Sequence, residues 1–169
     1  FVYDPENIGY FLRKNTPEEC KTSDFQDISL WREFNYQTLK WMEETYPGVI
    51  LAPMTINREP YFDEIVSRLR AEGIEIRHII LSASRETLLK RLKKRSLGRL
   101  SREEFAVQAI EKSLDFFAFR PEEEKVETDF LTVDQVVEQV AGRCGLILKE
   151  DRRSWLKRYL NRGKVMLEH

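Results

Sequence analysis

Short apolar runs alternate along this chain with segments in which apolar residues recur every three or four positions. The short runs are typical of β-strands and lie at residues 1–3, 49–52, 74–81 and 125–131. The other segments are typical of helices and carry their apolar positions within residues 30–42, 62–69, 88–92, 105–117 and 136–140. Because strands and helices alternate with short connections, we expect one three-layer α/β domain, a parallel sheet with helices on both faces.

The pattern also predicts which side of each element faces the core. The run at 49–52 has no polar alternation, which is expected of a strand covered on both faces. The predicted inward residues of the two longest early helices are Leu30, Phe34, Trp41 and Met42 on the first, and Phe62, Ile65, Val66 and Leu69 on the second. Side-chain caps are predicted at Ser23 with Gln26, at Ser84, and at Thr132 with Gln135.

The composition fits a folded protein and excludes several classes. Of the 169 residues 41% are hydrophobic and the net charge is −1, so neither disorder nor a nucleic-acid partner is expected. The two cysteines, Cys20 and Cys144, are too few and too far apart for a disulfide scaffold or a cysteine-based zinc site. No apolar run approaches the ~20 residues that span a bilayer, and we expect a cytoplasmic protein.

The ends of the chain need separate treatment. We expect one α/β domain over residues 1–149 with a lid at about 91–104, and a basic amphipathic helix over 150–166. Such a helix either packs onto the domain or makes a peripheral membrane contact through residues 152–166. Residues 167–169 resemble the remnant of a purification tag. The chain opens inside an apolar run, so we expect residues to precede Phe1.

Polar residues follow the predicted strands, and ligands of open parallel sheets bind outside the carboxyl ends of the strands. These residues are Asp4, Thr55, Ser82, Ser84, Thr128 and Asp129. Asp4 is placed to accept a proton from a substrate hydroxyl or to reach a metal ion through water. An aspartate here can equally well cap the following helix or end the strand, so both interpretations stay open.

Positive charge gathers between Arg85 and Arg102, where eight Lys and Arg residues meet a single acid, Glu86. Such a segment can close over phosphates, because the guanidinium group matches phosphate oxygens in shape and charge. The alternative is a solvated helix face. Arg32, near Trp31 and Tyr36, can grip an anionic or ring-bearing substrate or form a surface ion pair.

Several segments together carry a family resemblance. They are Tyr3-Asp4-Pro5-Glu6, Leu30-Trp31-Arg32 with Phe34-Asn35-Tyr36, Ala52-Pro53-Met54-Thr55-Ile56, and Ala83-Ser84 with Glu86-Thr87-Leu88-Leu89-Lys90-Arg91-Leu92. In order and spacing they resemble the tunicamycin-resistance ATP-binding protein family, which is similar to small P-loop kinases. The resemblance runs from Phe1 to about Ala141. It implies a P-loop kinase-like fold whose first strand, phosphate loop and first helix would precede Phe1.

The resemblance also implies roles for individual residues. Asp4 matches the acidic residue beside the accepting hydroxyl, and Arg32, with Thr55, would bind the substrate. Nucleotide contacts are implied for Arg91, Arg95, Arg99, Thr128 and Asp129, with Arg102 competing among the lid cations. ATP and Mg²⁺ would be held through the upstream phosphate loop.

The leading hypothesis is therefore an ATP-dependent phosphotransferase acting on a small hydroxylated or nucleoside-like molecule. The alternative is a nucleotide-binding protein that sequesters an antibiotic such as tunicamycin without turnover.

Overall fold

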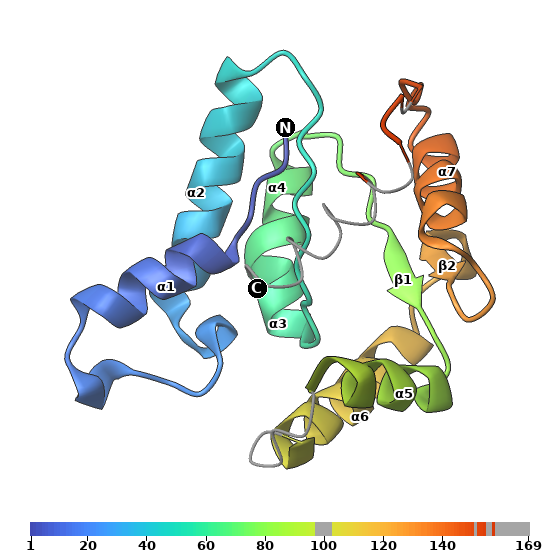
Figure 1. Cartoon of the computed structure of the whole chain (residues 1–169). Helices are drawn as coiled ribbons and strands as arrows, with labels where there is room; N and C mark the ends of the chain where they lie inside the picture. Colours follow the sequence, from blue (N-terminus) through green and yellow to red (C-terminus); the bar gives the residue numbers. More distant parts are fainter. Residues whose placement is uncertain (97–102, 151, 155–156, 158–169) are drawn as a thin grey trace. The chain divides into compact units, whose positions relative to one another are not determined.

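The computed structural model describes residues 1–96, 103–150, 152–154 and 157, with only the backbone of residues 95–96 and 103–105. The chain, drawn in Figure 1, divides into two compact units, Phe1–Phe130 and Leu131–His169. The predicted domain over 1–149 stays a prediction. So does the membrane contact through residues 152–166, because most of that segment lies outside the described residues.

Helices dominate both units. In the first unit the α-helices are α1 (Glu6–Asn15), α2 (Ser29–Thr45), α3 (Glu59–Phe62), α4 (Arg68–Ala71), α5 (Arg85–Ser96) and α6 (Glu103–Ala118). A π-helical turn, η3 (Asp63–Ser67), joins α3 to α4. The short 3₁₀ helices are η1 (Glu18–Cys20), η2 (Phe25–Asp27) and η5 (Glu122–Glu124), and the second unit contains α7 (Val133–Arg143). None of the described helices is both long and apolar enough to cross a membrane.

Two short parallel pairings supply the β-structure of the first unit. Strands β1 (Ile80–Ser82) and β2 (Lys125–Glu127) pair in parallel, with Leu81 opposite Val126. A parallel bridge joins Val2 to Leu51, and the Tyr3 N–H donates to the Leu51 carbonyl at 2.8 Å. The α/β class with parallel strands is confirmed in this coarse form, while the three-layer arrangement stays a prediction. Two predicted strands are shorter than expected, since residues 74–79 and 128–131 are not in strands.

The prediction that residues 49–52 are covered on both faces is wrong for the described structure. Val49 is 50% exposed and Leu51 is 46% exposed. Leu51 makes its backbone bonds to Phe1 and Tyr3, and no strand partner is described for the opposite edge of this segment. Side chains of a strand point to the faces of the sheet, so the exposure of Val49 and Leu51 means that no described element covers them fully.

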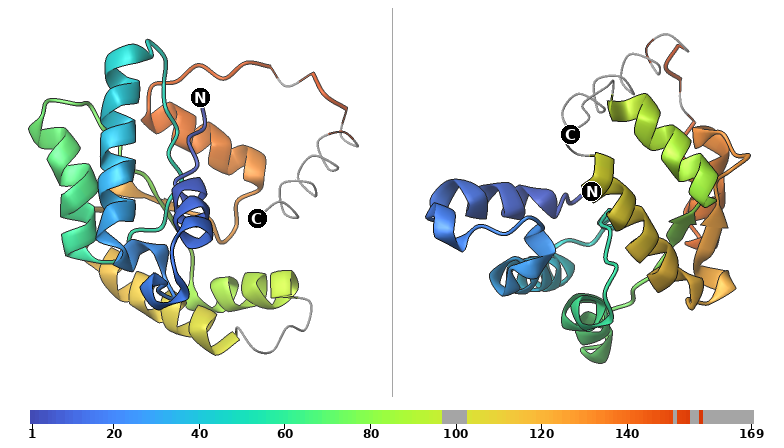
Figure 2. Two further views of the ribbon diagram at one scale, coloured as in Figure 1. Left: turned by 90° about the vertical axis from the view of Figure 1, so that its left-hand side faces the viewer. Right: turned by 90° about the horizontal axis from the view of Figure 1, so that it is seen from below.

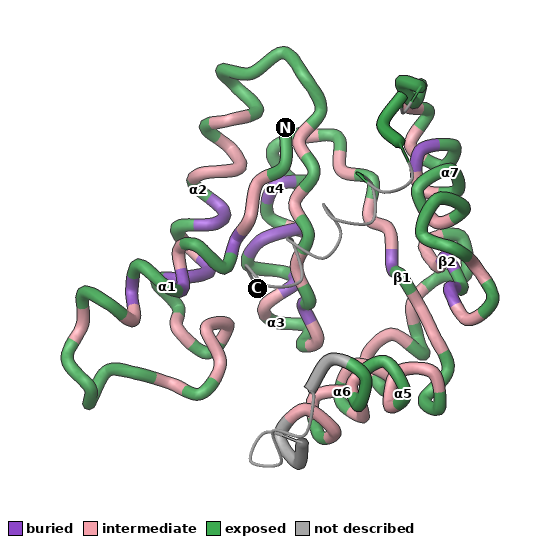
Figure 3. The backbone as a smooth tube through the Cα atoms, viewed as in Figure 1, coloured by how far each residue is buried: buried purple, intermediate pink, exposed green. Residues whose placement is uncertain are grey.

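The main apolar core of the first unit lies among α1, α2 and the α3–α4 segment (Figure 3). It consists of Leu12, Trp31, Tyr36, Ile56, Phe62, Ile65, Val66 and Leu69. The predicted inward face of residues 62–69 is therefore confirmed. Helices α5 and α6 lie against each other in the same unit (Figure 2).

The predicted inward face of α2 is wrong. Leu30 is 46% exposed and Trp41 is 62% exposed, whereas Arg32 and Asn35 are buried with Trp31 and Tyr36. Polar groups can be buried when their hydrogen bonds are satisfied. The Asn35 amide donates to the Trp31 carbonyl at 2.8 Å and accepts from the Tyr3 hydroxyl at 2.6 Å, so burial leaves the amide paired.

Helix starts follow local hydrogen bonding. The capping box of Thr132 and Gln135 at the start of α7 is confirmed. Ser84 also caps as predicted, because its hydroxyl accepts from the Thr87 N–H at 3.3 Å. The cap predicted for Ser23 is wrong, since the Asp24 carboxylate accepts from the Gln26 N–H at 3.0 Å. Asp is as good a cap as Ser, and its position one residue later sets the start of η2.

Candidate functional site

The candidate residues follow the carboxyl ends of the parallel segments. Residues 1–3 and 49–51 run parallel by their bridge, and in Figure 1 this pair and β1 run in the same direction. Asp4 and Thr55 lie just beyond the first pair, and Thr128 and Asp129 just beyond β2. The structure therefore places these candidates at the ends of strands where ligands of parallel sheets bind.

Asp4 is held by both of its neighbours against α2. The Tyr3 hydroxyl bonds to Asn35, and the indole N–H of Trp31 donates to the carbonyl of the buried Pro5 at 3.0 Å. The Asp4 Oδ1 atom accepts from the Glu6 N–H at 2.9 Å, which orders the first turn of α1. The structural interpretation of Asp4 is therefore observed, and a carboxylate at a helix N-terminus is also favoured by the helix dipole. A catalytic role is compatible with this contact and stays a prediction.

Arg32 is a buried cation fixed on several sides. Its Nε donates to Glu64 Oε2 at 2.6 Å, and its Nη1 donates to the Gln26 carbonyl. The guanidinium carbon lies 4.3 Å from the centre of the Tyr61 ring. The ion pair expected for Arg32 is therefore present. It is not a surface pair on the arginine side, because Arg32 is only 8% exposed.

Thr55 is connected to Arg32 through one residue, Gln26, by its side-chain amide and its backbone carbonyl. The amide of Gln26 donates to the Thr55 carbonyl at 2.5 Å, while the Gln26 carbonyl accepts from Arg32. The two substrate-binding candidates are thus brought together, although Thr55 contributes its backbone and its side chain stays exposed. The contact runs through Gln26, which carried no functional signal in the sequence.

A polar triad beside Arg32 was missed by the sequence reasoning. The Arg58 Nη1 donates to the Asp27 carboxylate and to the Tyr61 hydroxyl, both at 2.8 Å, and that hydroxyl donates to Asp27 at 2.7 Å. Burial, and then the Asp27 carboxylate, raise the pKa of the Tyr61 hydroxyl, so it is a proton donor here. In the sequence Asp27 lies 31 and 34 positions before Arg58 and Tyr61, and no periodicity links it to them.

Three nucleotide-binding candidates gather at the end of β2. The Arg91 guanidinium donates to the Thr128 hydroxyl at 2.9 Å and to the Thr128 carbonyl at 2.7 Å. The Asp129 carboxylate accepts from the Ser84 N–H at 2.9 Å. Hydrogen bonds from the Thr87 hydroxyl and the Ser84 backbone lower the pKa of Asp129, so the carboxylate is held in its charged form.

The basic face of α5 is partly neutralised. Arg85 pairs with Glu111 of α6 at 2.6 Å, and Lys90 pairs with Glu86 at 2.8 Å. Of the other predicted nucleotide contacts, Arg99, together with the competing Arg102, lies outside the described residues, and Arg95 is described only in its backbone. Their contacts with phosphate stay predictions.

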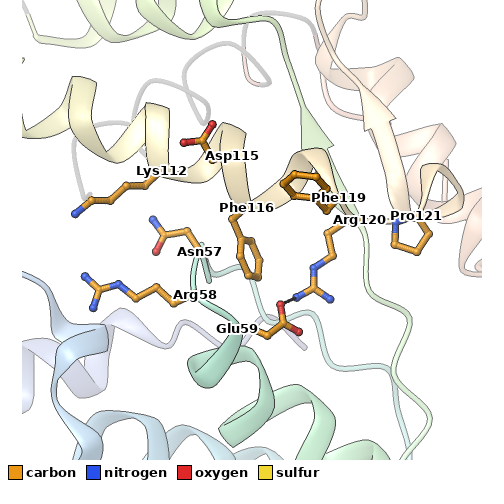
Figure 4. Close-up of a pocket in the computed structure, with 9 residues that line it drawn as sticks. All are labelled: Asn57, Arg58, Glu59, Lys112, Asp115, Phe116, Phe119, Arg120 and Pro121. Atoms are coloured by element: carbon orange, nitrogen blue, oxygen red, sulfur yellow. Dashed lines mark hydrogen bonds and ion pairs between the residues drawn. The ribbon is translucent and has the colours of Figure 1, made fainter.

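A cleft of about 720 Å³ opens between residues 57–59, at the start of α3, and residues 112–121, in and just after α6. Its walls include Asn57, Arg58, Glu59, Lys112, Phe116, Phe119 and Arg120 (Figure 4). The volume is in the range of small-molecule sites, ~300–1,000 Å³. Arg58 belongs both to this cleft and to the triad beside Arg32, so the cleft adjoins the substrate-binding candidates.

Comparison with known proteins bears on the family. No protein-family model and no curated protein matches this chain. The solved structure of the Deinococcus radiodurans tunicamycin resistance protein superimposes with a TM-score of 0.71 and 26% sequence identity. The match covers 89% of this chain and 85% of that one. The resemblance inferred from the sequence is confirmed.

This match extends through most of the chain rather than through one motif. The elements that carry the quoted segments, from Tyr3-Asp4 through α2 to α5, are those that position Asp4, Arg32, Thr55 and Arg91. The site candidates and the family resemblance therefore rest on the same part of the fold.

Proposed function

We propose that this protein confers tunicamycin resistance as an ATP-dependent phosphotransferase with a P-loop kinase-like, three-layer fold. The observation that carries the proposal is the structural similarity to a tunicamycin resistance protein over most of both chains. The substrate would be tunicamycin or a related hydroxylated, nucleoside-like molecule. Asp4 would orient or deprotonate the accepting hydroxyl, and Arg32 and Thr55 would line the substrate side.

The nucleotide would be ATP with Mg²⁺, held by a strand and phosphate loop expected upstream of Phe1. Support comes from the edges of the two parallel pairs. The backbone groups of Ile50 and Ala52 point away from the Val2–Leu51 bridge, and no described residue bonds to them. Leu81 of β1 is 58% exposed. Parallel strands are ordinarily paired at their edges and covered on both faces, so the open edge at Ile50 and Ala52 suits a further strand and the exposed Leu81 suits a further covering element.

The described residues also fit a polyphosphate. Two N–H groups of Arg91 donate to Thr128. A guanidinium has five N–H groups, so the remaining ones can bind phosphate oxygens. When bound, ATP supplies the transferable phosphoryl group and Mg²⁺ neutralises its charge. The part of this chain would be to hold the acceptor, exclude water and place the Asp4 carboxylate.

A second function, sequestration of the drug without turnover, is favoured by a different observation. The Asp4 Oδ1 atom already accepts from the Glu6 N–H, which suits a residue that shapes a binding site rather than one that takes a proton from the drug.

The test is mass spectrometry of tunicamycin after incubation with the full-length protein, ATP and Mg²⁺. A phosphorylated drug supports the phosphotransferase. Unmodified drug bound tightly supports sequestration and rejects phosphoryl transfer. If the drug is neither modified nor bound, and expression does not raise the tolerance of sensitive cells, the whole proposal is wrong.

A further inference from the structure

The cleft between the start of α3 and α6 carries chemistry that the proposed function does not use. Two elements far apart in sequence build it, residues 57–59 and residues 112–121. They are tied together by the Arg120–Glu59 ion pair at 2.7 Å and by a bond from the Asn57 amide to the Ser113 hydroxyl at 3.4 Å. The cleft is therefore fixed by contacts on both sides.

One end of the cleft is rich in hydrogen-bond donors. In Figure 4 the Lys112 ammonium, the Asn57 amide and the Arg58 guanidinium lie on the same side of the Phe116 ring. Arg58 is held by Asp27 and Tyr61 through Nη1, which leaves Nε and Nη2 for a ligand. Lys112 is exposed and has no ion-pair partner within the part of the chain that the structure describes. Asp115, three residues farther along α6, also lines the cleft, and it forms no ion pair with Lys112 in the described structure.

The other end offers aromatic surface. The Arg120 guanidinium lies between Phe62 and Phe116, 4.2 Å and 4.6 Å from the ring centres, and its charge is balanced by Glu59. Phe119 is 92% exposed at the rim. A free aromatic face beside a cleft is a stacking surface for a flat ring.

We propose that this cleft binds an anion that carries a flat ring, of the nucleoside monophosphate class. The phosphate would bond to Lys112, with Arg58 and Asn57 as further donors, and the ring would stack on Phe119. An ammonium without a carboxylate partner next to a guanidinium favours a dianionic group over a neutral one. The inference does not depend on tunicamycin or on phosphoryl transfer.

The test is titration calorimetry of this chain with cytidine 5′-monophosphate, cytidine and inorganic phosphate, without ATP. A pyrimidine nucleotide avoids the adenine contacts implied for Thr128 and Asp129. Lys112→Met should weaken binding of the monophosphate about tenfold to a hundredfold, as loss of a charge-assisted bond does. Phe119→Ala should weaken it about fivefold or more through lost stacking.

Two exposed residues outside the cleft provide matched controls. Lys14→Met and Phe130→Ala remove the same groups elsewhere and should leave the affinity unchanged. Binding of the monophosphate no tighter than that of cytidine overturns the proposal, as does equal binding by Lys112→Met and Lys14→Met. Absence of binding at millimolar concentration also overturns it. None of these results bears on whether tunicamycin is modified.

Discussion

Arg32 offers the sharpest test of how the site is held together. The variant Arg32→Met keeps most of the apolar stem but removes the guanidinium group. Two kinds of partner are then lost: the acceptors Glu64 and Gln26, and the ring of Tyr61. Because Arg32 is only 8% exposed, little water can replace these contacts on its side.

The expected loss follows from each partner. The Glu64 side chain is 47% exposed and can be rehydrated, so the ion pair itself contributes about 0–1 kcal/mol. The bond to the half-buried Gln26 carbonyl contributes about 1–2 kcal/mol because a charged donor is lost. The contact with the Tyr61 ring adds about 0.5–1 kcal/mol. The total is about 1.5–4 kcal/mol.

Urea unfolding followed by circular dichroism measures this loss. The midpoint should fall, while the dependence of the unfolding free energy on urea concentration should stay unchanged. Arg77→Met is the matched control, because the Arg77–Glu75 pair has both side chains exposed, 64% and 76%. It should change the unfolding free energy by less than about 0.5 kcal/mol. If the two variants unfold at the same urea concentration, the argument that Arg32 anchors the substrate side of the site is wrong.

Three further predictions concern the rest of the fold. Gly9→Ala should destabilise the protein by about 1–3 kcal/mol in urea unfolding, because the new Cβ would lie 2.4 Å from the Phe25 ring. Gly142→Ala in α7 is the matched control: its new Cβ meets no neighbour, and it should stabilise the protein by up to about 1 kcal/mol. Equal effects of the two variants would contradict this prediction. Thr132→Ala should cost about 1 kcal/mol by removing the capping box and should speed amide exchange in the first turn of α7, and unchanged exchange would argue against the cap. Folding lowers the pKa of Asp129, so the ionised carboxylate stabilises the folded protein at pH values above the pKa of the unfolded chain. This contribution to the unfolding free energy is lost as the pH falls through the pKa of the folded protein. An acid titration of stability should therefore be shallower for Asp129→Asn than for the native protein, and identical curves would refute the assignment.

Elements with strong local signals could be predicted from the sequence. The inward face of residues 62–69 and the Thr132–Gln135 cap are each set by neighbours within a few positions, and both are found. Helix α1 was not predicted, although Asp4 was considered as a cap and the apolar residues of the helix lie on one face. Its start depends on the Glu6–Asp4 bond, and its packing depends on Gly9 lying against Phe25.

The arrangement of the site needed tertiary information. The sequence suggested Arg32, Thr55, Arg91 and Thr128, but not that Gln26 connects the first two or that Arg91 bonds to Thr128. The buried face of α2 was misjudged because Arg32 and Asn35 are polar, and only their distant partners make their burial favourable. Hydrogen bonds between residues some 30 positions apart leave no periodic trace in a single sequence.

Asp4 provides the most direct test of the proposed phosphotransferase. Asp4→Asn in the full-length protein removes the carboxylate charge but keeps an Oδ1 acceptor for the Glu6 N–H, so the turn at the start of α1 is preserved. With ATP, Mg²⁺ and tunicamycin, the account predicts a native circular dichroism spectrum and a turnover lowered by about 10²–10⁴-fold. A folded variant that phosphorylates the drug at the native rate would contradict it.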